Sequence, residues 1–302
     1  MTRYRVTHRT LYRYGEPVTL CHNEAHLRPR SGPFQNCLSH QVNVVPVPDA
    51  VAERRDFFGN PVYYFSVEKP HESLDVMATS EVEVAWPTKL ELAEPLSWEQ
   101  AAEITRTSRD PECIDARSFV LESPFVSIEK DVATYTAKSF APGRDVLESI
   151  REYIGRIFVD FKFDPASTTI ATPLLQVLDQ RRGVCQDFAH LAIAGLRTMG
   201  IAARYVSGYI ETVPPEGEER LIGADASHAW LSAFVPGLGW IDLDPTNNHF
   251  PVTSHVTLAW GRDYGDVTPL KGVITGGGGH TLVVAVDVIR LADRQPSHAA
   301  AH

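Results

Sequence analysis

Three short segments in the second half of the chain carry residues that together could perform thiol chemistry. Residues 183–188 (GVCQDF) contain Cys185, residues 227–230 (SHAW) contain His228, and residues 239–246 (GWIDLDPT) contain Asp242 and Asp244. A cysteine attacks as its thiolate and therefore needs a base, and a histidine base needs a partner on its second ring nitrogen. A cysteine, a histidine and an aspartate in this order predict a nucleophile with an oriented base.

Cys185 is expected at the beginning of a helix. Gly183 precedes it in a turn, and apolar residues then recur at three- and four-residue steps until Gly200, which favours a helix end. The recurring residues are Phe188, Leu191, Ala192, Gly195, Leu196 and Met199. The first helical turn has unpaired backbone N–H groups and the positive end of the helix dipole, and both stabilise a thiolate. The same N–H groups could stabilise an oxyanion.

Each of these residues also has an ordinary structural interpretation. A lone cysteine is often a small buried residue, a histidine beside a tryptophan often only packs, and an aspartate before proline is common in turns. Asp242 competes with Asp244 for the third role, because residues two apart in a strand share a face. Asp187 and His190 either line the site or are polar groups on the nucleophile helix, so neither is assigned a role.

Two strands are expected to carry His228 and Asp244, joined by a hairpin loop at residues 236–239 (PGLG). A regular four-residue loop would place the two side chains on opposite faces of the hairpin. Contact between them therefore requires an odd loop, in which Phe234 faces Trp240, or a bulge that inserts one residue. A glycine with positive φ would permit either arrangement.

Helical patterns also lie ahead of Cys185. Residues 97–100 (SWEQ) resemble a capping box, and an apolar stripe that includes Phe158 predicts a helix from about residue 143. Beyond the nucleophile helix, residues 202–210 are predicted as a strand and the polar residues 214–219 as a loop.

The chain divides into regions that differ in their patterns of polar and apolar residues. Residues 1–95 alternate polar and apolar residues between turns rich in glycine and proline, which predicts an antiparallel β-sandwich domain. Residues 96–260 hold the three motifs and the patterns around them. Residues 261–292 end in the apolar strand 282–288, which is expected to pair back onto the N-terminal sheet, and residues 293–302 are expected to be a disordered tail.

The composition argues against several classes of function. The net charge of -10 and the lack of Lys/Arg clusters longer than a pair argue against nucleic acid or an anionic membrane as partner. No apolar run approaches the roughly 20 residues that span a bilayer, and the N-terminus lacks the apolar core of an export signal. The four cysteines are widely spaced, so they predict free thiols in a reducing, cytoplasmic compartment. The sequence contains no motif for a nucleotide loop, a zinc protease or an EF-hand, and we expect no cofactor and no metal.

The three motifs, in their order and at their separations, resemble the transglutaminase-like superfamily of cysteine enzymes. The N-terminal β region and residues 263–269 (DYGDVTP) resemble its bacterial branch, which has a β domain of its own, so the resemblance covers most of the chain. It implies an α+β fold with a papain-like core, in which the nucleophile helix packs on an antiparallel sheet. Carried onto the matching positions, it implies Cys185 as nucleophile, His228 as base and Asp244, immediately before Pro-Thr, as the orienting acid.

The resemblance also implies an activity: attack on a carboxamide carbonyl, a thioester intermediate, and transfer to an amine or to water. We expect a cysteine-dependent amide or isopeptide hydrolase (a protease, amidase or deamidase) rather than a crosslinking acyltransferase, because water is the default acceptor. The expected substrate is a peptide or a glutamine-like carboxamide. The alternative is a non-catalytic peptide-binding or scaffold module on the same fold, and the oligomeric state is left open.

Overall fold

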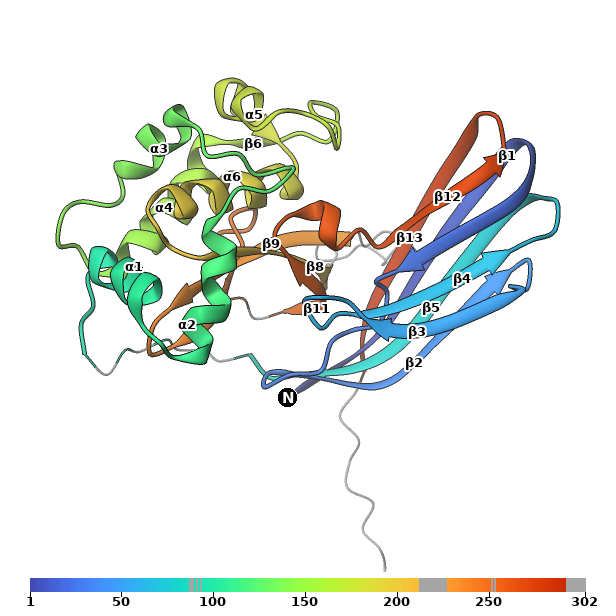
Figure 1. Cartoon of the computed structure of the whole chain (residues 1–302), viewed down its shortest axis with the longest axis horizontal. Helices are drawn as coiled ribbons and strands as arrows, with labels where there is room; N and C mark the ends of the chain where they lie inside the picture. The colour runs from blue at the N-terminus through green and yellow to red at the C-terminus, as the bar shows by residue number, and fades with distance from the viewer. Residues whose placement is uncertain are drawn as a thin grey trace, which may run out of the picture.

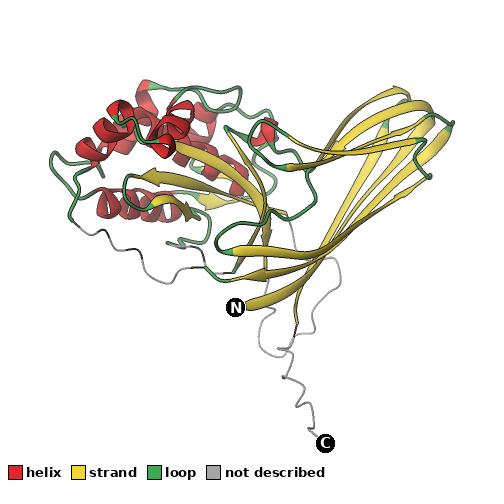
Figure 2. Ribbon diagram, turned by 60° about the horizontal axis from the view of Figure 1, so that its bottom comes forward, coloured by secondary structure: helices red, strands yellow, loops and turns green. Residues whose placement is uncertain are grey.

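The computed structural model describes residues 1–86, 90, 92, 94–211, 227–250, 252 and 254–291 of the chain. The loop expected at residues 214–219 and the tail expected from residue 293 lie outside these residues. The described chain is an α+β structure in which helices gather around a small sheet while long strands form a separate layer (Figure 1). Figure 2 shows these strands extending away from the helices.

One long strand organises the N-terminal part. β1 (Thr2–Ala25) lies inside a seven-stranded antiparallel sheet, where its first half pairs with β5 and β13 and its second half with β4 and β12. The other strands are β2 (Gln35–Val45), β3 (Ala50–Arg55), β4 (Pro61–Val67), β5 (His71–Val84), β12 (Leu270–Gly276) and β13 (His280–Leu291). The expected antiparallel β structure is confirmed. Since β1 pairs along both of its halves, the seven strands form one continuous hydrogen-bonded sheet.

The C-terminal strand returns to the N-terminal sheet, as expected. β13 pairs with β1 from Arg3 to Tyr14, and its Val286 side chain is buried together with Tyr4 and Val6 of β1. These side chains belong to the same apolar cluster as the buried residues in the middle of the chain. The beginning and the end of the chain therefore form one surface that packs against the middle.

The middle of the chain is built around the helix that begins with Cys185. This helix, α6 (Cys185–Thr198), packs on a four-stranded antiparallel sheet with the order β10-β9-β8-β11. The strands are β8 (Ala203–Ile210), β9 (Ser227–Val235), β10 (Gly239–Leu243) and β11 (His255–Gly261). The other elements are α1 (Trp98–Thr107), α2 (Pro111–Ala116), η1 (Arg117–Val120), α3 (Lys130–Ala137), α4 (Val146–Asp160), β6 (Lys162–Phe163), α5 (Leu174–Gln180), β7 (Arg182–Gly183) and η2 (Tyr264–Asp266). No helix in the described part of the chain has the length and apolarity needed to cross a membrane.

Local sequence explains where the helices begin. The capping box predicted at Ser97 is present, with the Ser97 hydroxyl accepting from Gln100 N and the Gln100 side chain accepting from Ser97 N. At α4, which begins with Val146, Asp145 Oδ1 accepts from the amides of Leu147 and Glu148 at 2.9 and 3.1 Å. Most of the apolar stripe of α4 is buried. Phe158 is 47% exposed because it lies one residue past the buried Ile157 and so points outward.

Helix α6 approaches α3 and α4 closely at Gly195. A Cβ at this position would lie 2.0 Å from Tyr153 Oη and 2.3 Å from Thr136 Oγ1. The Tyr153 hydroxyl donates to Leu191 O at 2.9 Å. The side chains of Tyr153 and Thr136 are both buried, so neither can move aside freely. The missing side chain thus allows the nucleophile helix to pack against its neighbours.

We expect Gly195→Ala to lower the free energy of unfolding by about 1–3 kcal/mol, because overpacking displaces buried side chains. Urea unfolding followed by circular dichroism measures the change. Gly32→Ala is the matched control, since a Cβ there has no heavy atom within 4 Å. Equal stability of the two variants would contradict the packing described at Gly195.

Candidate active site

Cys185 is the first residue of α6, as predicted. The Asp187 carboxylate caps this helix, because its Oδ2 accepts from Val184 N at 2.8 Å and from Thr168 Oγ1 at 2.7 Å. Gly183 is required for that approach, since a Cβ there would lie 2.7 Å from Asp187 Oδ2. Asp187 therefore fixes the turn that delivers the cysteine to the helix.

The first amides of α6 are placed to act on a ligand beside the sulfur. The first N–H groups of an α-helix have no carbonyl of the same helix to bond. The first bond of this ladder runs from Phe188 N to Val184 O at 3.1 Å, so the N–H groups of Cys185 and Gln186 precede it. Such N–H groups can stabilise the oxyanion that forms when a thiolate attacks a carbonyl.

The hairpin of β9 and β10 has the odd register that the predicted contact requires. Trp240 pairs with Phe234, and the loop turns through Gly237 at φ 88°, a left-handed conformation that favours glycine. His228 and Asp244 consequently share a face. Their side chains meet, with 2.8 Å between His228 Nε2 and Asp244 Oδ2.

Asp244 is fully buried and accepts hydrogen bonds on both oxygens. Oδ1 accepts from the backbone N–H groups of Thr246 and Asn247 at 2.9 and 3.2 Å. Oδ2 accepts from His228, from His255 Nε2 at 3.0 Å and from Asn247 Nδ2 at 2.7 Å. Burial by itself would raise the pKa of Asp244, but the hydrogen bonds from both histidines and the charge of His228 hold that pKa below its usual range.

The proton on His228 is stabilised by both of its neighbours. Burial by itself would lower the pKa of His228, but hydrogen bonds to Asp244 and to Cys185 raise it to about 10. Since Nε2 of the ring bonds Asp244, Nδ1 is the nitrogen left for the sulfur. The arrangement favours a protonated His228 ring at neutral pH, with the Cys185 sulfur beside it.

Asp242, the rival for the third role, holds a different side chain. Its Oδ2 accepts from Trp230 Nε1 at 2.9 Å, and its Oδ1 accepts from the Ser232 hydroxyl. Trp230 in turn stacks on His228, with 5.9 Å between the ring centroids and 26° between the planes. Asp242 therefore fixes the tryptophan beside the base, whereas Asp244 bonds the base itself.

His255 is a residue of this site that sequence reasoning missed. It is fully buried at the start of β11, and burial lowers its pKa, so the ring is neutral and carries its proton on Nε2, toward Asp244. Its proximity to Asp244 depends on β11 pairing with β8 in the same sheet as β9. The only sequence signal was a histidine opening an apolar strand.

The same residues are also the one cluster of metal-ligand type in the described part of the chain. The ligand atoms of His228, Asp244 and His255 all lie within 4.8 Å of one another. The Nε2 atoms of His228 and His255 both bond the Asp244 carboxylate already. A metal ion there would compete with the contacts that orient His228.

A cavity of about 270 Å³ opens beside Cys185 and His228. Tyr205 and Tyr264 are among the residues that line it from the part of the chain around α6. The N-terminal sheet also lines it, through His8, Thr10 and Tyr12 of β1 and Leu282 and Val284 of β13. The β domain therefore forms part of the wall of this cavity.

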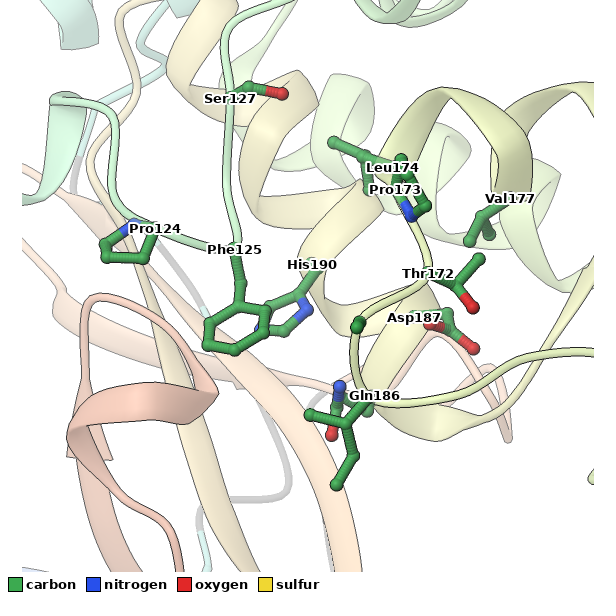
Figure 3. A pocket seen from close by; sticks show the side chains of 12 residues that line it. Pro124, Phe125, Ser127, Thr172, Pro173, Leu174, Val177, Gln186, Asp187 and His190 are labelled. Carbon is green, nitrogen blue, oxygen red and sulfur yellow. The ribbon is translucent and has the colours of Figure 1, made fainter.

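A second hollow of about 390 Å³ lies on the other side of Gln186, which lines both (Figure 3). In it the Phe125 ring stacks on His190 with 5.7 Å between centroids, and His190 Nε2 accepts from Tyr264 N at 3.2 Å. Burial lowers the pKa of His190 to about 4. His190 is thus a neutral packing residue, and the question left open by the sequence is answered against a role as base.

A helix that begins with cysteine and packs on an antiparallel sheet bearing a histidine–aspartate pair defines a papain-like core. Residues 133–245 match the transglutaminase-like superfamily, and residues 4–83 match the bacterial transglutaminase-like N-terminal region. The chain belongs to the transglutaminase-like superfamily, in the bacterial branch with this N-terminal region.

Proteins similar to this chain cover it to different extents. An uncharacterized protein of Mycobacterium tuberculosis is 41% identical over 95% of this chain and 92% of its own length. The solved structure of a candidate cysteine protease from Cytophaga hutchinsonii has a TM-score of 0.76 at 20% identity, covering 97% of this chain and 91% of that one. A protein-glutamine gamma-glutamyltransferase of Pseudomonas aeruginosa is 32% identical over 28% of this chain and 14% of its own length.

We expect substoichiometric iodoacetamide at pH 6 to modify Cys185 before the other three thiols, all of which are free. Cys185 is half-buried beside His228, Cys113 is buried, and burial raises the pKa of Cys21 and Cys37. Peptide mapping after a short exposure identifies the labelled residue. Faster labelling of any other cysteine would contradict the contact between Cys185 and His228 described here.

Proposed function

We propose that this protein is a cysteine-dependent amide hydrolase or acyltransferase that works through a thioester on Cys185. One observation carries the proposal: Cys185 at the start of α6 and His228 line one cavity, and Asp244 bonds His228 from behind. A nucleophile, a base and a residue that orients the base are the three parts that thiol acyl chemistry needs.

In the acylation step the Cys185 thiolate attacks the carbonyl carbon of a carboxamide, and a carbon–sulfur bond forms. The N–H groups at the start of α6 stabilise the oxyanion, and each such donor lowers the barrier by about 3 kcal/mol. The His228 imidazolium then gives its proton to the departing nitrogen as the carbon–nitrogen bond breaks. The amine or ammonia leaves, and a thioester remains with a neutral His228.

In the second step His228 acts as a general base. It takes a proton from water, or from a primary amine, while the oxygen or nitrogen attacks the thioester carbon. The carbon–sulfur bond breaks, the acid or new amide leaves, and the thiolate–imidazolium pair is restored. Asp244 keeps the ring oriented throughout, and it stays ionised because its oxygens accept five hydrogen bonds.

We favour hydrolysis over crosslinking, with a protease, amidase or deamidase activity on a peptide or glutamine-like carboxamide. Water is the default acceptor of a thioester unless a site excludes it. The aromatic and aliphatic wall of Tyr12, Leu282 and Val284 suits an apolar part of the substrate next to the reacting amide. The partial likeness to a gamma-glutamyltransferase keeps the amine acceptor as the second outcome to test.

The test is mass spectrometry after incubation with glutamine-containing peptides and isopeptide-linked peptides, each with and without a primary amine. The expected result is deamidated or cleaved peptide in both conditions, absent with Cys185→Ala. Amide formation with the added amine in place of the acid would instead establish an acyltransferase. No change in any peptide, combined with slow thiol labelling of Cys185, would favour a non-catalytic binding module.

We also propose a reducing, cytoplasmic location for the enzyme. All four cysteines are free, which fits a compartment that keeps thiols reduced. Cell fractionation with an antibody to the protein tests this, and recovery from an oxidising compartment would contradict it.

A further inference from the structure

A third cavity lies against the same sheet as His228 and Asp244 but away from Cys185. It has a volume of about 370 Å³, and its lining includes Asp242 but neither Cys185 nor His228. Its walls combine four aromatic rings and two arginines, which are Phe34, Trp86, Trp240, Trp260, Arg30 and Arg204. Loop residues ahead of β2 form the cavity together with residues of β8, β10 and β11. A partly apolar hollow with a few convergent polar groups is the usual form of a small-ligand site.

The arginines in this cavity are held by aromatic rings. The guanidinium carbon of Arg204 lies 4.2 Å from the ring centroid of Trp240 and 3.8 Å from that of Trp260. The guanidinium carbon of Arg30 lies 3.4 Å from the centroid of Trp260. Cation–π contacts of this kind fix the plane of the guanidinium group and leave its edge free to donate hydrogen bonds.

The hydrogen-bonding capacity of the arginines is not satisfied by the described residues. Arg204 is only 8% exposed, yet its Nε has no hydrogen-bond partner in the described part of the chain, and the same holds for the buried Nε of Arg30. Arg30 does donate from Nη1, to Phe58 O at 3.2 Å and to the Asn60 side chain. A buried cation without a full set of acceptors is costly, so a site that retains one has a reason to bind an anion.

The carboxylates near the two arginines already accept other hydrogen bonds. Asp242 is the carboxylate in the described lining, and its two oxygens accept from Trp230 and Ser232. Asp56, whose charge acts on Arg30 from outside the lining, accepts from the backbone of Phe58 and from the backbone and side chain of Asn60. The Nε groups of Arg30 and Arg204 therefore bond neither carboxylate. Burial lowers the pKa of Arg204 to about 9 and that of Arg30 to about 10, because it removes water that would solvate the two charges.

We propose that this cavity is a binding site for a carboxylate carried on an aromatic or other apolar body. The planar fork of Arg204 matches a carboxylate, and the tryptophan and phenylalanine rings match the body. The carboxylate could come from a free acid or from the C-terminal residue of a peptide. The site does not depend on the reaction at Cys185.

The test uses the full-length protein with Cys185 alkylated, so that no probe is turned over. Isothermal titration calorimetry compares phenylacetate (a free acid) and N-acetyl-Ala-Ala-Phe (a peptide C-terminus) with the corresponding primary amides. We expect at least one carboxylate to bind at least about tenfold more tightly than its amide, since a charged hydrogen bond is lost in the amide. The acid that binds identifies the source.

Arg204→Met is expected to reduce carboxylate affinity by about tenfold or more. Arg109→Met is the matched control, because Arg109 is exposed and lies outside the cavity. Thermal unfolding checks that each variant is folded.

A second pair of variants keeps the test decisive if Arg204→Met does not fold. Gly32 lines the cavity, and a Cβ there meets no heavy atom within 4 Å, so longer side chains fit. Gly32→Glu adds a carboxylate at the mouth and is expected to weaken carboxylate binding several-fold relative to Gly32→Gln. If neither acid binds, if the amides bind as tightly, or if Gly32→Glu and Gly32→Gln bind alike, the arginines form only a structural cation–π stack and the proposal fails.

Discussion

Cys185→Ala is expected to abolish turnover of any carboxamide substrate, with a fall in kcat of at least about 10⁴-fold, since removal of a nucleophile leaves only binding and oxyanion stabilisation. The side chain is small and half-buried, so the fold should be retained. Steady-state kinetics on the first substrate found with the peptide panel measures the effect.

The matched control is Cys113→Ala, which removes a buried thiol from α2, away from the active-site cavity. Its rate should stay within a few-fold of the unaltered protein. A Cys185→Ala enzyme that keeps most of its activity would show that the chemistry lies elsewhere, whatever the likeness of the motifs.

Asp244→Asn is expected to lower the rate by about 10²–10⁴-fold while the protein stays folded, because a mis-oriented imidazole is a poor base. Asp242→Asn is the matched comparison: the same chemical change, two residues away on the same strand face, at a carboxylate that bonds Trp230 and Ser232. We expect a much smaller loss there. A damaging Asp242→Asn beside a neutral Asp244→Asn would mean that the third residue has been misassigned.

The same substitution should change the pH dependence. The raised pKa of His228, about 10, keeps the imidazolium proton available for the leaving group up to that pH. Without the Asp244 carboxylate that pKa falls toward its usual value of about 6.5, so the alkaline limb of kcat/KM should move to lower pH. An unchanged limb in Asp244→Asn would contradict the coupling between the two side chains.

The pair also makes a prediction about stability. The raised pKa of His228 stabilises the fold fully below about pH 6.5, and that contribution is lost as pH rises through about 10. The lowered pKa of Asp244 stabilises it above about pH 4, and that contribution is lost as pH falls. The difference in unfolding free energy between the unaltered protein and Asp244→Asn should therefore be largest between these limits.

Much of the site could be predicted because its parts are local. A periodic apolar pattern ending at Gly200 placed Cys185 at a helix start. Strand parity required either that Trp240 face Phe234 or that a bulge insert one residue if His228 and Asp244 were to meet, and the structure has the first arrangement. Both follow from rules that act over a few residues.

Other parts could not be predicted because they depend on distant segments meeting. His255 reaches Asp244 only through the pairing of β11 with β8, and the arginine–tryptophan cavity joins loop residues near Arg30 to strands two hundred residues later. Choosing Asp244 over Asp242 required the family pattern, because parity places both on one face. The geometry distinguishes them by their partners, His228 for one and Trp230 for the other.

The most direct test of the central claim is to trap the acyl-enzyme. Rapid acid quenching after mixing with an active carboxamide, followed by peptide mapping, should show the acyl group as a thioester on Cys185, removed by hydroxylamine and absent from Cys185→Ala. Productive turnover with no adduct at Cys185, or with the acyl group on another residue, would contradict the account.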